Sequence, residues 1–301
     1  MNVDFVNVAD LGAGGLSEVL GIAAAVKADR ASVAGSRPGI DVGLFFEKPS
    51  LRTRVSCEVA VNDLGMIPYV LKNDEIGLGK REAVKDVGAV LDRYLDVLAL
   101  RVFDHRNLET IAANADAPVI NLLSDREHPC QALADLQTLA EARPLDGSTV
   151  AFIGDGNNVC NSLMIAGAMM GVSTRVAGPA GFAPPDDMVA AARAAAGDRA
   201  EIMITDDPAE AVRGADAVYT DVWASMGQED EAAARRALFE PYRVDEALFG
   251  LAAPTAVFLH CLPAHRGDEL TDAVADHQRS RIYDQAENRM HAFKALLLLL
   301  T

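Results

Sequence analysis

Short apolar runs rich in β-forming residues alternate with longer stretches of helical periodicity, and this alternation constrains the fold more than any other feature of the chain. Such a rhythm is typical of parallel sheets whose strands are joined by crossover helices. Helical patterns occur at 52–64, 81–94, 108–113, 128–141 and 287–300. Nine runs have the length and composition of buried strands: 42–46, 67–71, 97–101, 118–122, 149–153, 174–177, 201–205, 217–220 and 256–260. The fold class that this pattern predicts is α/β.

The length of the chain predicts two domains. Its 301 residues exceed what one ordinary core accommodates. Pro144 and Gly147 lie close together after a helical pattern and mark a turn or a domain junction. We expect a first domain over residues 1–143 and a second over residues 144–285, each a parallel β-sheet flanked by helices. The C-terminal helix, within residues 286–301, is expected to return to the first domain and complete it.

Charge and composition argue against several classes of partner. The chain has 27 basic and 44 acidic residues, a formal net charge of −17. Because so acidic a surface repels nucleic acid and anionic lipid, we expect neither a nucleic-acid partner nor a membrane partner. The longest purely apolar run, 295–300, is far too short to span a bilayer, and residues 1–13 carry acids without a basic, apolar pattern, so we expect no signal sequence. Four cysteines without a CxxC pair predict a reducing, cytoplasmic environment.

A first candidate site follows the predicted strand at 42–46. Pro49 prevents the next helix from beginning early, and Ser50 is a natural N-cap for that helix. A helix N-terminus offers free N–H groups and a partial positive charge, to which Arg52 adds a guanidinium suited to phosphate oxygens. Ser50 and Thr53 add hydroxyl donors. The combination indicates a phosphate site, although a capped helix with solvated arginines has the same local pattern.

A second candidate site follows the predicted strand at 118–122. Pro129 fits the first turn of the next helix, so His128 and Gln131 would lie at the mouth of that helix. Open α/β sheets bind ligands at the carboxyl ends of their strands. His128 could therefore donate to a carbonyl oxygen, and Gln131 could hold an amide. A helix cap or a buried hydrogen-bonding partner is the alternative role for His128.

A third candidate site, His-Cys-Leu-Pro at 260–263, ends another predicted strand. Cys261 is either a reactive thiol or a packed residue. His260 and His265 match no known zinc spacing, so we expect no metal. The Gly-Asp-Gly segment at 154–156 also follows a strand, but Val159 stands where a dinucleotide fingerprint has its third glycine. We therefore expect no cofactor.

Taken together, these motifs resemble a known family, the aspartate/ornithine carbamoyltransferases. The Ser-Met-Gly loop and Cys261, where the aspartate enzymes usually have proline, resemble the ornithine branch of that family. The resemblance covers essentially the whole chain and rests on five ordered motifs: Ser-Leu-Arg-Thr-Arg at 50–54, His-Pro-Cys-Gln at 128–131, Ser-Met-Gly at 225–227, His-Cys-Leu-Pro at 260–263 and Glu-Asn-Arg-Met-His at 287–291. It implies transfer of a carbamoyl group from carbamoyl phosphate to the side-chain amine of L-ornithine, as in arginine biosynthesis.

The resemblance also implies a role for each matching residue. Arg101 and His128 would polarise the carbonyl as an oxyanion hole does, while Asp221 and Cys261 would orient and deprotonate the amine. Ornithine would be bound by Asn158, Asp221, Ser225 and Met226. Carbamoyl phosphate would be bound by Ser50, Leu51, Arg52, Thr53, Arg101, His128, Pro129, Cys130, Gln131, Cys261, Leu262 and Arg289. Four arginines from distant positions would then form one basic pocket in an acidic protein: Arg52, Arg54, Arg101 and Arg289.

Two departures from the family pattern accompany the resemblance. Leu51 replaces a threonine that is frequent in the phosphate motif, which removes one hydroxyl. Near Gly77 the chain lacks a glutamine that, in many relatives, reaches the site of a neighbouring subunit; Lys80 and Arg81 are candidates to replace it. Because the family generally forms trimers with shared active sites, we expect a homotrimer or a multiple of trimers.

Several functions remain open at this level. The acceptor could be an acylated ornithine, putrescine or aspartate in place of ornithine. The chain could also be a catalytically silent paralogue, or a nucleotide-binding α/β protein. For an ornithine enzyme, we expect the loop at 225–227 to close after carbamoyl phosphate binds, which predicts ordered substrate binding.

Overall fold

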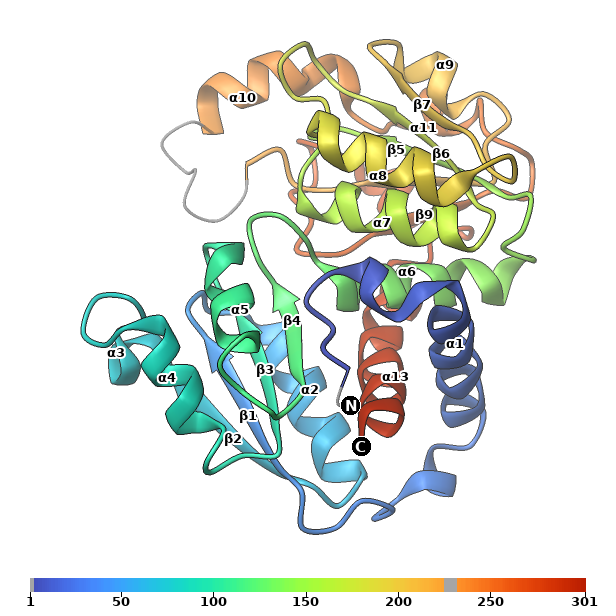
Figure 1. The fold of residues 1–301 in the computed structure, drawn as a ribbon. Coiled ribbons are helices and arrows are strands. Elements are labelled where there is room, and N and C mark those ends of the chain that lie inside the picture. The colour runs from blue at the N-terminus through green and yellow to red at the C-terminus, as the bar shows by residue number, and fades with distance from the viewer. Residues whose placement is uncertain (1–2, 225–231) are drawn as a thin grey trace. The chain divides into compact units, whose positions relative to one another are not determined.

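The computed structural model describes residues 3–224 and 232–301 and divides the chain into two compact units (Figure 1). Unit 1 consists of Met1–Gln137 with Glu287–Thr301, and unit 2 consists of Thr138–Ala286. The division falls within the helix α6 (Pro129–Ala142). Most of the last helix, α13 (Ile282–Leu300), belongs to unit 1 although it ends the chain.

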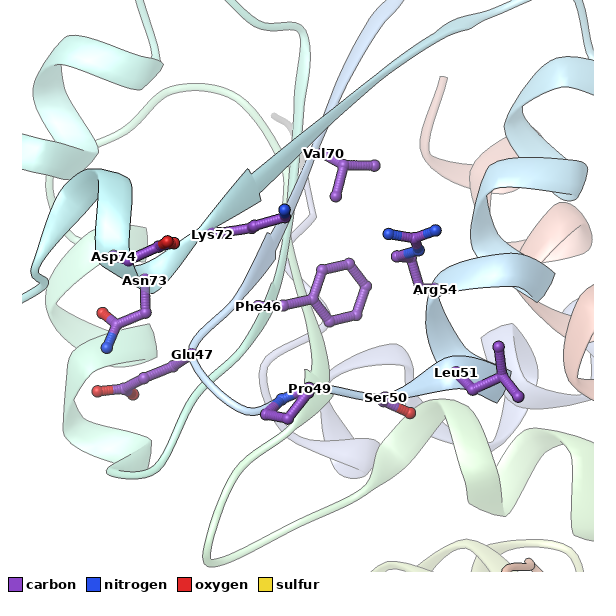
Figure 2. A pocket seen from close by; sticks show the side chains of 10 residues that line it. All are labelled: Phe46, Glu47, Pro49, Ser50, Leu51, Arg54, Val70, Lys72, Asn73 and Asp74. Carbon is purple, nitrogen blue, oxygen red and sulfur yellow. The ribbon is translucent and has the colours of Figure 1, made fainter.

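Unit 1 is built on a parallel four-stranded sheet in the order β2-β1-β3-β4. Phe46 at the end of β1 is paired in register with Lys72 at the end of β2 (Figure 2) and with Arg101 at the end of β3. The strand order reverses between β1 and β3, so the loops that follow these two strands diverge at a topological switch point, where open sheets bind ligands. The strands are β1 (Asp41–Phe46), β2 (Ile67–Lys72), β3 (Val97–Arg101) and β4 (Val119–Leu123).

The helices of unit 1 bury apolar faces against this sheet and against one another. One cluster of buried side chains joins Phe45 of β1 and Leu98 of β3 to Leu108 and Ile111 of α5. The helices are α1 (Gly12–Ala28), α2 (Leu51–Asp63), α3 (Asn73–Ile76), α4 (Val84–Leu91) and α5 (His105–Ala112), with the first part of α6 and most of α13.

The segment Val8–Ala28, which includes α1, is long and apolar enough to cross a membrane by length and composition alone. Five side chains of α1 are buried at the spacing of a single helical face: Leu16, Val19, Leu20, Ala23 and Val26. At its end, Lys27 Nζ donates to Asn288 Oδ1 of α13 at 2.8 Å. The segment therefore contacts the rest of unit 1 through the buried face of α1 and through Lys27.

Unit 2 is built on a parallel five-stranded sheet in the order β7-β6-β5-β8-β9. Its order reverses between β5 and β8, so the switch point lies at the loops after these two strands. The strands are β5 (Thr149–Ile153), β6 (Ser173–Ala177), β7 (Ile202–Thr205), β8 (Ala217–Thr220) and β9 (Val257–His260). The helices are α7 (Asn158–Met169), α8 (Asp186–Ala196), α9 (Pro208–Val212), α10 (Ala232–Phe239), α11 (Glu246–Phe249) and α12 (Asp272–Ala275), with the remainder of α6 and α13.

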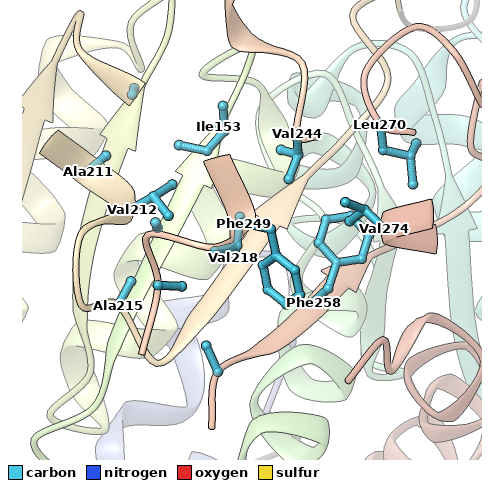
Figure 3. Close-up of a cluster of buried hydrophobic side chains, with 14 of the residues drawn as sticks. Ile153, Ala211, Val212, Ala215, Val218, Val244, Phe249, Phe258, Leu270 and Val274 are labelled. Atoms are coloured by element: carbon cyan, nitrogen blue, oxygen red, sulfur yellow. The ribbon is translucent and has the colours of Figure 1, made fainter. Parts of the chain in front are cut away.

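One face of the unit 2 sheet packs on a buried apolar cluster (Figure 3). Phe249 of α11 and Phe258 of β9 meet edge to face, with ring centroids 6.0 Å apart. Val218 of β8 and Val274 of α12 belong to the same cluster. This core holds β8 and β9 in place, and the loops that follow them carry Asp221 and Cys261.

The predicted fold class is confirmed, and each predicted strand ends within one residue of the observed ends. The helix predicted at 81–94 is wrong at both ends, because α4 spans only Val84–Leu91. Gly79 N donates to Glu82 O at 3.0 Å, and this turn delays the start of the helix. In contrast, α5 begins three residues before the predicted 108–113, since Asp104 caps it by accepting from Arg106 N.

Candidate functional site

The unit 1 switch point carries a buried polar group that we call the basic cluster: Thr53, Arg101, His128, Gln131 and Arg289. Each of these five side chains is at least nine-tenths buried. They come from α2, the end of β3, the approach to α6, α6 itself and α13. The structure thus brings together within unit 1 residues from three separate motifs, at 50–54, 128–131 and 287–291, with Arg101 from the end of a strand.

Ser50 begins α2 as predicted. Its backbone is extended, with φ −156° and ψ 113°, and its Oγ accepts from Thr53 N at 3.3 Å. The helix then starts at Leu51, whose side chain is 73% exposed. Backbone N–H groups at a helix N-terminus lack carbonyl partners from a preceding turn of helix, and such a terminus favours an anion.

The Thr53 hydroxyl is the centre of the basic cluster. Its Oγ1 accepts from Ser50 Oγ at 3.0 Å and from Arg289 Nη2 at 3.0 Å, with Arg101 Nη1 at 3.5 Å. A hydroxyl has two lone pairs and one hydrogen. Because the two shorter bonds occupy both lone pairs, the hydrogen is directed elsewhere and can be donated to a bound anion.

A β-bulge sets the position of Arg101. Strands β3 and β4 pair regularly through Leu100 and Asn121, and then the register shifts so that Arg101 lies opposite Leu123. Such irregularities re-aim side chains at sheet ends. Here the bulge accompanies an arginine whose guanidinium reaches the hydroxyl of Thr53 from the neighbouring side of the switch point.

Burial and two arginines keep His128 neutral. Desolvation is the largest cause, and the positive charges of Arg289 and Arg101 add to it, so the pKa of His128 lies well below its usual value of 6.5. A neutral imidazole has one N–H donor and one acceptor. His128 can therefore donate a hydrogen bond to a carbonyl oxygen at neutral pH without carrying a charge.

Gln131 and Arg289 are joined across a long separation in sequence. Arg289 Nη1 donates to Gln131 Oε1 at 2.5 Å, and Gln131 Nε2 donates to Asp135 Oδ1 at 2.7 Å. Pro129 is the first residue of α6, as expected. Cys130 is buried, its Sγ donates to Asn121 O at 3.4 Å, and burial raises the pKa of its thiol to about 12. Cys130 is therefore a packing residue with an unreactive thiol.

The predicted convergence of four arginines is only partly observed. Arg54 lies outside the basic cluster, because its Nε is 3.3 Å from Glu58 Oε1 one turn along α2. Its side chain and that of Leu51 line a hollow of ≈ 400 Å³ beside the ends of β1 and β2, shown in Figure 2. The side chains of Glu47 and Asp74 also line this hollow. The sequence did not predict the hollow.

Asp221 is the centre of the polar group at the unit 2 switch point. Its Oδ1 accepts from Cys261 Sγ at 3.0 Å, and its Oδ2 accepts from Asn157 Nδ2 at 2.8 Å. Asn157 caps α7 through Val159 N and Cys160 N, whereas the predicted Asn158 is the first residue of that helix. Sequence reasoning missed Asn157, although an asparagine before a helical pattern is a recognisable N-cap signal.

Unit 2 has a further group of polar contacts around Asp155, next to the Asp221 site. Arg235 Nη1 of α10 donates to Asp155 Oδ2 at 2.8 Å and to Trp223 O at 3.0 Å. Burial raises the pKa of Asp155, and Arg235 opposes this shift. The two neighbouring glycines have backbone roles: Gly154 has φ 134°, and a Cβ on Gly156 would lie 2.2 Å from Pro184 N. These backbone requirements explain the two glycines of the Gly-Asp-Gly segment, and no nucleotide-binding role is needed to explain them.

His260 supports the loop that carries Cys261. Its Nδ1 accepts from Leu262 N at 2.9 Å, so its Nε2 carries the hydrogen that faces Glu269 Oε1 at 3.2 Å. Leu262 adopts a left-handed φ of 58°. Asp221, His260 and Cys261 place possible metal-ligand atoms within 4.8 Å of one another. Both ring nitrogens of His260 are engaged, however, so this cluster has no free imidazole lone pair for a metal.

Two predicted ornithine residues, Ser225 and Met226, lie outside the residues that the structure describes.

Comparisons with known proteins agree with both units. The family model described as the carbamoyl-P binding domain of aspartate/ornithine carbamoyltransferase matches residues 3–141, and the model of the Asp/Orn binding domain matches residues 146–300. The chain belongs to the aspartate/ornithine carbamoyltransferase family. The resemblance stated from the motifs is thereby confirmed.

Relatives within this carbamoyltransferase family match over nearly the whole chain. The ornithine carbamoyltransferase of Acidothermus cellulolyticus is 51% identical over 284 residues, which cover 93% of this chain and 90% of the relative. That of Nostoc punctiforme is 47% identical over 295 residues, which cover 98% and 95%. The solved ornithine carbamoyltransferase from Pyrococcus furiosus has a TM-score of 0.96 at 43% identity, covering 99% of this chain and 96% of that one. An acetylornithine transcarbamylase complexed with acetylcitrulline has the same fold at 27% identity, with a TM-score of 0.89 and coverage of 99% of both chains.

Proposed function

We propose that this protein transfers the carbamoyl group of carbamoyl phosphate to the side-chain amine of L-ornithine, giving L-citrulline and phosphate. The observation that carries this proposal is the pairing of Cys261 with Asp221 in a chain that also contains the basic cluster. The Cys261–Asp221 pair is suited to bind an amine, and the basic cluster is suited to bind an acyl phosphate. Relatives at 47% and 51% identity are named ornithine carbamoyltransferases, which supports the choice of acceptor.

The basic cluster fits the needs of the phosphate donor. The N-terminus of α2, with Ser50, the amide of Leu51, Arg52 and Thr53, holds the phosphate oxygens. Arg101 lies close enough to Thr53 to neutralise the phosphate and to approach the carbonyl oxygen. Arg289 supports both Thr53 and Gln131 from the other side.

The neutral state of His128 determines how it acts. An imidazole whose pKa lies well below 6.5 cannot supply a proton at neutral pH, so it stabilises the developing oxyanion through its N–H. Arg101 adds a positive charge to the same oxygen. Gln131 accepts a hydrogen bond from the carbamoyl nitrogen. Together these groups make the carbonyl carbon more electrophilic without protonating it.

The Asp221 site fits the needs of the acceptor. An alkyl amine of this kind has a pKa of about 10.4, so about one in 2,500 is uncharged at pH 7. Asp221 attracts the ammonium form, and Asn157 and Cys261 fix the directions of its two oxygens. Asn158, Ser225 and Met226 bind the rest of ornithine.

The reaction balances without a cofactor or metal. The free amine nitrogen attacks the carbonyl carbon, and a C–N bond forms. The C–O bond to phosphate then breaks, and phosphate leaves with the bonding electron pair. The proton lost from the amine passes to Asp221 or to the departing phosphate. The parts that Cys261 and Leu262 take in binding carbamoyl phosphate stay predictions.

We further propose a homotrimer or a multiple of trimers, a cytoplasmic location and a role in arginine biosynthesis. These follow from the family and from the acidic, cysteine-poor composition. In a trimer with shared sites, Lys80 or Arg81 would replace the family glutamine near Gly77. Light scattering of the purified protein, repeated for Lys80→Ala and Arg81→Ala alongside kinetic assays, tests this part separately.

The deciding experiment measures product formation from carbamoyl phosphate with four acceptors in parallel: ornithine, acetylornithine, putrescine and aspartate. We expect turnover with ornithine alone. Turnover with acetylornithine and none with ornithine would replace the acceptor and leave the carbamoyl phosphate site in place. No turnover with any acceptor would identify a silent paralogue. Full kcat/KM in Cys261→Ala across the pH range would remove the thiol from the mechanism.

A further inference from the structure

Asp135 is a buried carboxylate that the proposed chemistry does not use. It lies on α6 one turn after Gln131 and is 1% exposed. Residues four apart on a helix share one face, so the two side chains are neighbours. Gln131 Nε2 donates to Asp135 Oδ1 at 2.7 Å, and this contact is itself buried.

The carboxylate determines which way the amide of Gln131 points. Asp135 Oδ1 is the acceptor in this contact, so the NH2 end of the amide faces Asp135. The carbonyl end then faces Arg289, whose Nη1 donates to Oε1 at 2.5 Å. The reversed amide would oppose its NH2 group to the guanidinium and its oxygen to the carboxylate. Both ends would then be unfavourable, so Asp135 and Arg289 together allow a single orientation.

This orientation leaves one hydrogen-bond acceptor for a ligand. A carbonyl oxygen has two lone pairs, and Arg289 uses one of those on Gln131 Oε1. The second lone pair can accept an N–H. Carbamoyl phosphate carries an NH2 group where the similarly shaped acetyl phosphate carries a methyl group, which donates no such bond.

We propose that Asp135 is a positioning residue that makes the site select a carbamoyl group over an acetyl group by fixing the amide of Gln131. The inference rests on the proposed function, because it assumes that Gln131 meets the carbamoyl nitrogen. Asp135 touches neither substrate in this scheme. It acts only through the direction of the Gln131 amide.

The test compares two acyl phosphates in Asp135→Asn. The quantity measured is the ratio of the inhibition constant of acetyl phosphate to the KM of carbamoyl phosphate, with ornithine saturating. The new amide can donate to or accept from Gln131, so only Arg289 still opposes the reversed orientation of Gln131. We expect the ratio to fall by up to about tenfold, the loss of one hydrogen bond, through a higher KM and an unchanged inhibition constant. If Asp135 had only a structural role, its replacement would raise the KM and the inhibition constant together and leave their ratio unchanged. An unchanged ratio would overturn the inference.

A swapped pair supplies the rescue. In the double variant Gln131→Glu with Asp135→Asn, the donor and the acceptor exchange places along the same contact. The carboxylate at 131 accepts from the amide at 135 and from Arg289, and it still presents an oxygen to the ligand. We expect the ratio to return to within about threefold of the wild-type value. A ratio that stays as low as in Asp135→Asn would contradict the proposal, even where that single variant folds poorly.

Two controls complete the design. Glu127→Gln removes another buried carboxylate of unit 1, whose Oε2 accepts from Val8 N at 2.9 Å, and should leave the ratio unchanged. Wild-type turnover with carbamoyl phosphate and ornithine is measured first. If it is absent, the proposed function fails; if it is present and Asp135→Asn keeps the wild-type ratio, only the role of Asp135 fails.

Discussion

Replacing Thr53 with valine tests the centre of the basic cluster. Valine has nearly the same shape, so Thr53→Val removes the hydroxyl and leaves the buried volume almost unchanged. Three donors lose an acceptor: Ser50 Oγ and Arg289 Nη2, each at 3.0 Å, and Arg101 Nη1 at 3.5 Å. The last is at the limit of a hydrogen bond and contributes little.

The magnitude follows from the remaining contacts. The free protein loses one bond from a charged donor, about 1.5–3 kcal/mol, and one neutral bond, about 1 kcal/mol. Since Arg289 and Ser50 can recover part of this by rearranging, we expect the free energy of unfolding to fall by about 2 kcal/mol. The ligand loses the O–H that Thr53 can donate. A bond from this hydroxyl to a charged phosphate is worth about 1.5–3 kcal/mol, which weakens binding about tenfold to a hundredfold.

Two assays measure these effects. Urea unfolding gives the stability, and titration calorimetry with carbamoyl phosphate or inorganic phosphate gives the affinity. Thr110→Val is the matched control, because Thr110 is a half-buried helical threonine of the same unit whose hydroxyl donates to Arg106 O at 2.7 Å. A phosphate affinity of Thr53→Val within twofold of that of Thr110→Val would refute the assignment of Thr53 to the phosphate site.

Three further predictions concern other side chains. Folding lowers the pKa of His128, so below about pH 6.5 the unfolded chain takes up a proton that the folded chain does not. The contribution of His128 to the free energy of unfolding is therefore intact above about pH 6.5 and is lost as the pH falls below that value. The free energy of unfolding of His128→Gln, measured in urea, should depend less on pH between about 7.5 and 5.5 than that of the wild type. Iodoacetamide should label Cys261 before the three buried cysteines, and ornithine should slow this labelling; peptide mass analysis that finds another cysteine labelled first would be contrary to the structure. Lys294→Met should lower the free energy of unfolding by about 2 kcal/mol, because Lys294 is fully buried against Asp63 while that acid also keeps Arg30 as a partner; an unchanged urea midpoint would contradict this.

Local chemistry in the sequence was enough to predict the strands and the first turn of α2. Apolar runs and the Pro49-Ser50 pair determine the secondary structure of residues next to them in the chain. Their effect can therefore be predicted without knowledge of any tertiary contact. The end of the strand at Arg101 was also predictable. Helix ends were less predictable, because Asp104 and the turn at Gly79 set them through specific hydrogen bonds that leave no trace in the hydrophobic periodicity.

Prediction of the site from the sequence was limited in the same way. Three separate motifs indicated Thr53, the pair His128 and Gln131, and Arg289, yet no local pattern relates α13 to α2 across 236 positions of sequence. Asp135 had no functional signal, because a carboxylate within a helical pattern usually faces solvent. Only its burial beside Gln131 reveals a different role.

The sequence by itself determined the α/β class, the family and the residue types that bind a phosphate and an amine, because these depend on periodicity and on short motifs. The tertiary structure decided which of these residues share an environment. It placed Arg101 and Arg289 on one threonine, excluded Arg54 from that group, and left His128 neutral by burying it beside two positive charges. Hydrogen-bond orientation and pKa depend on distances across the fold, and those distances exist only once the strands and helices have packed.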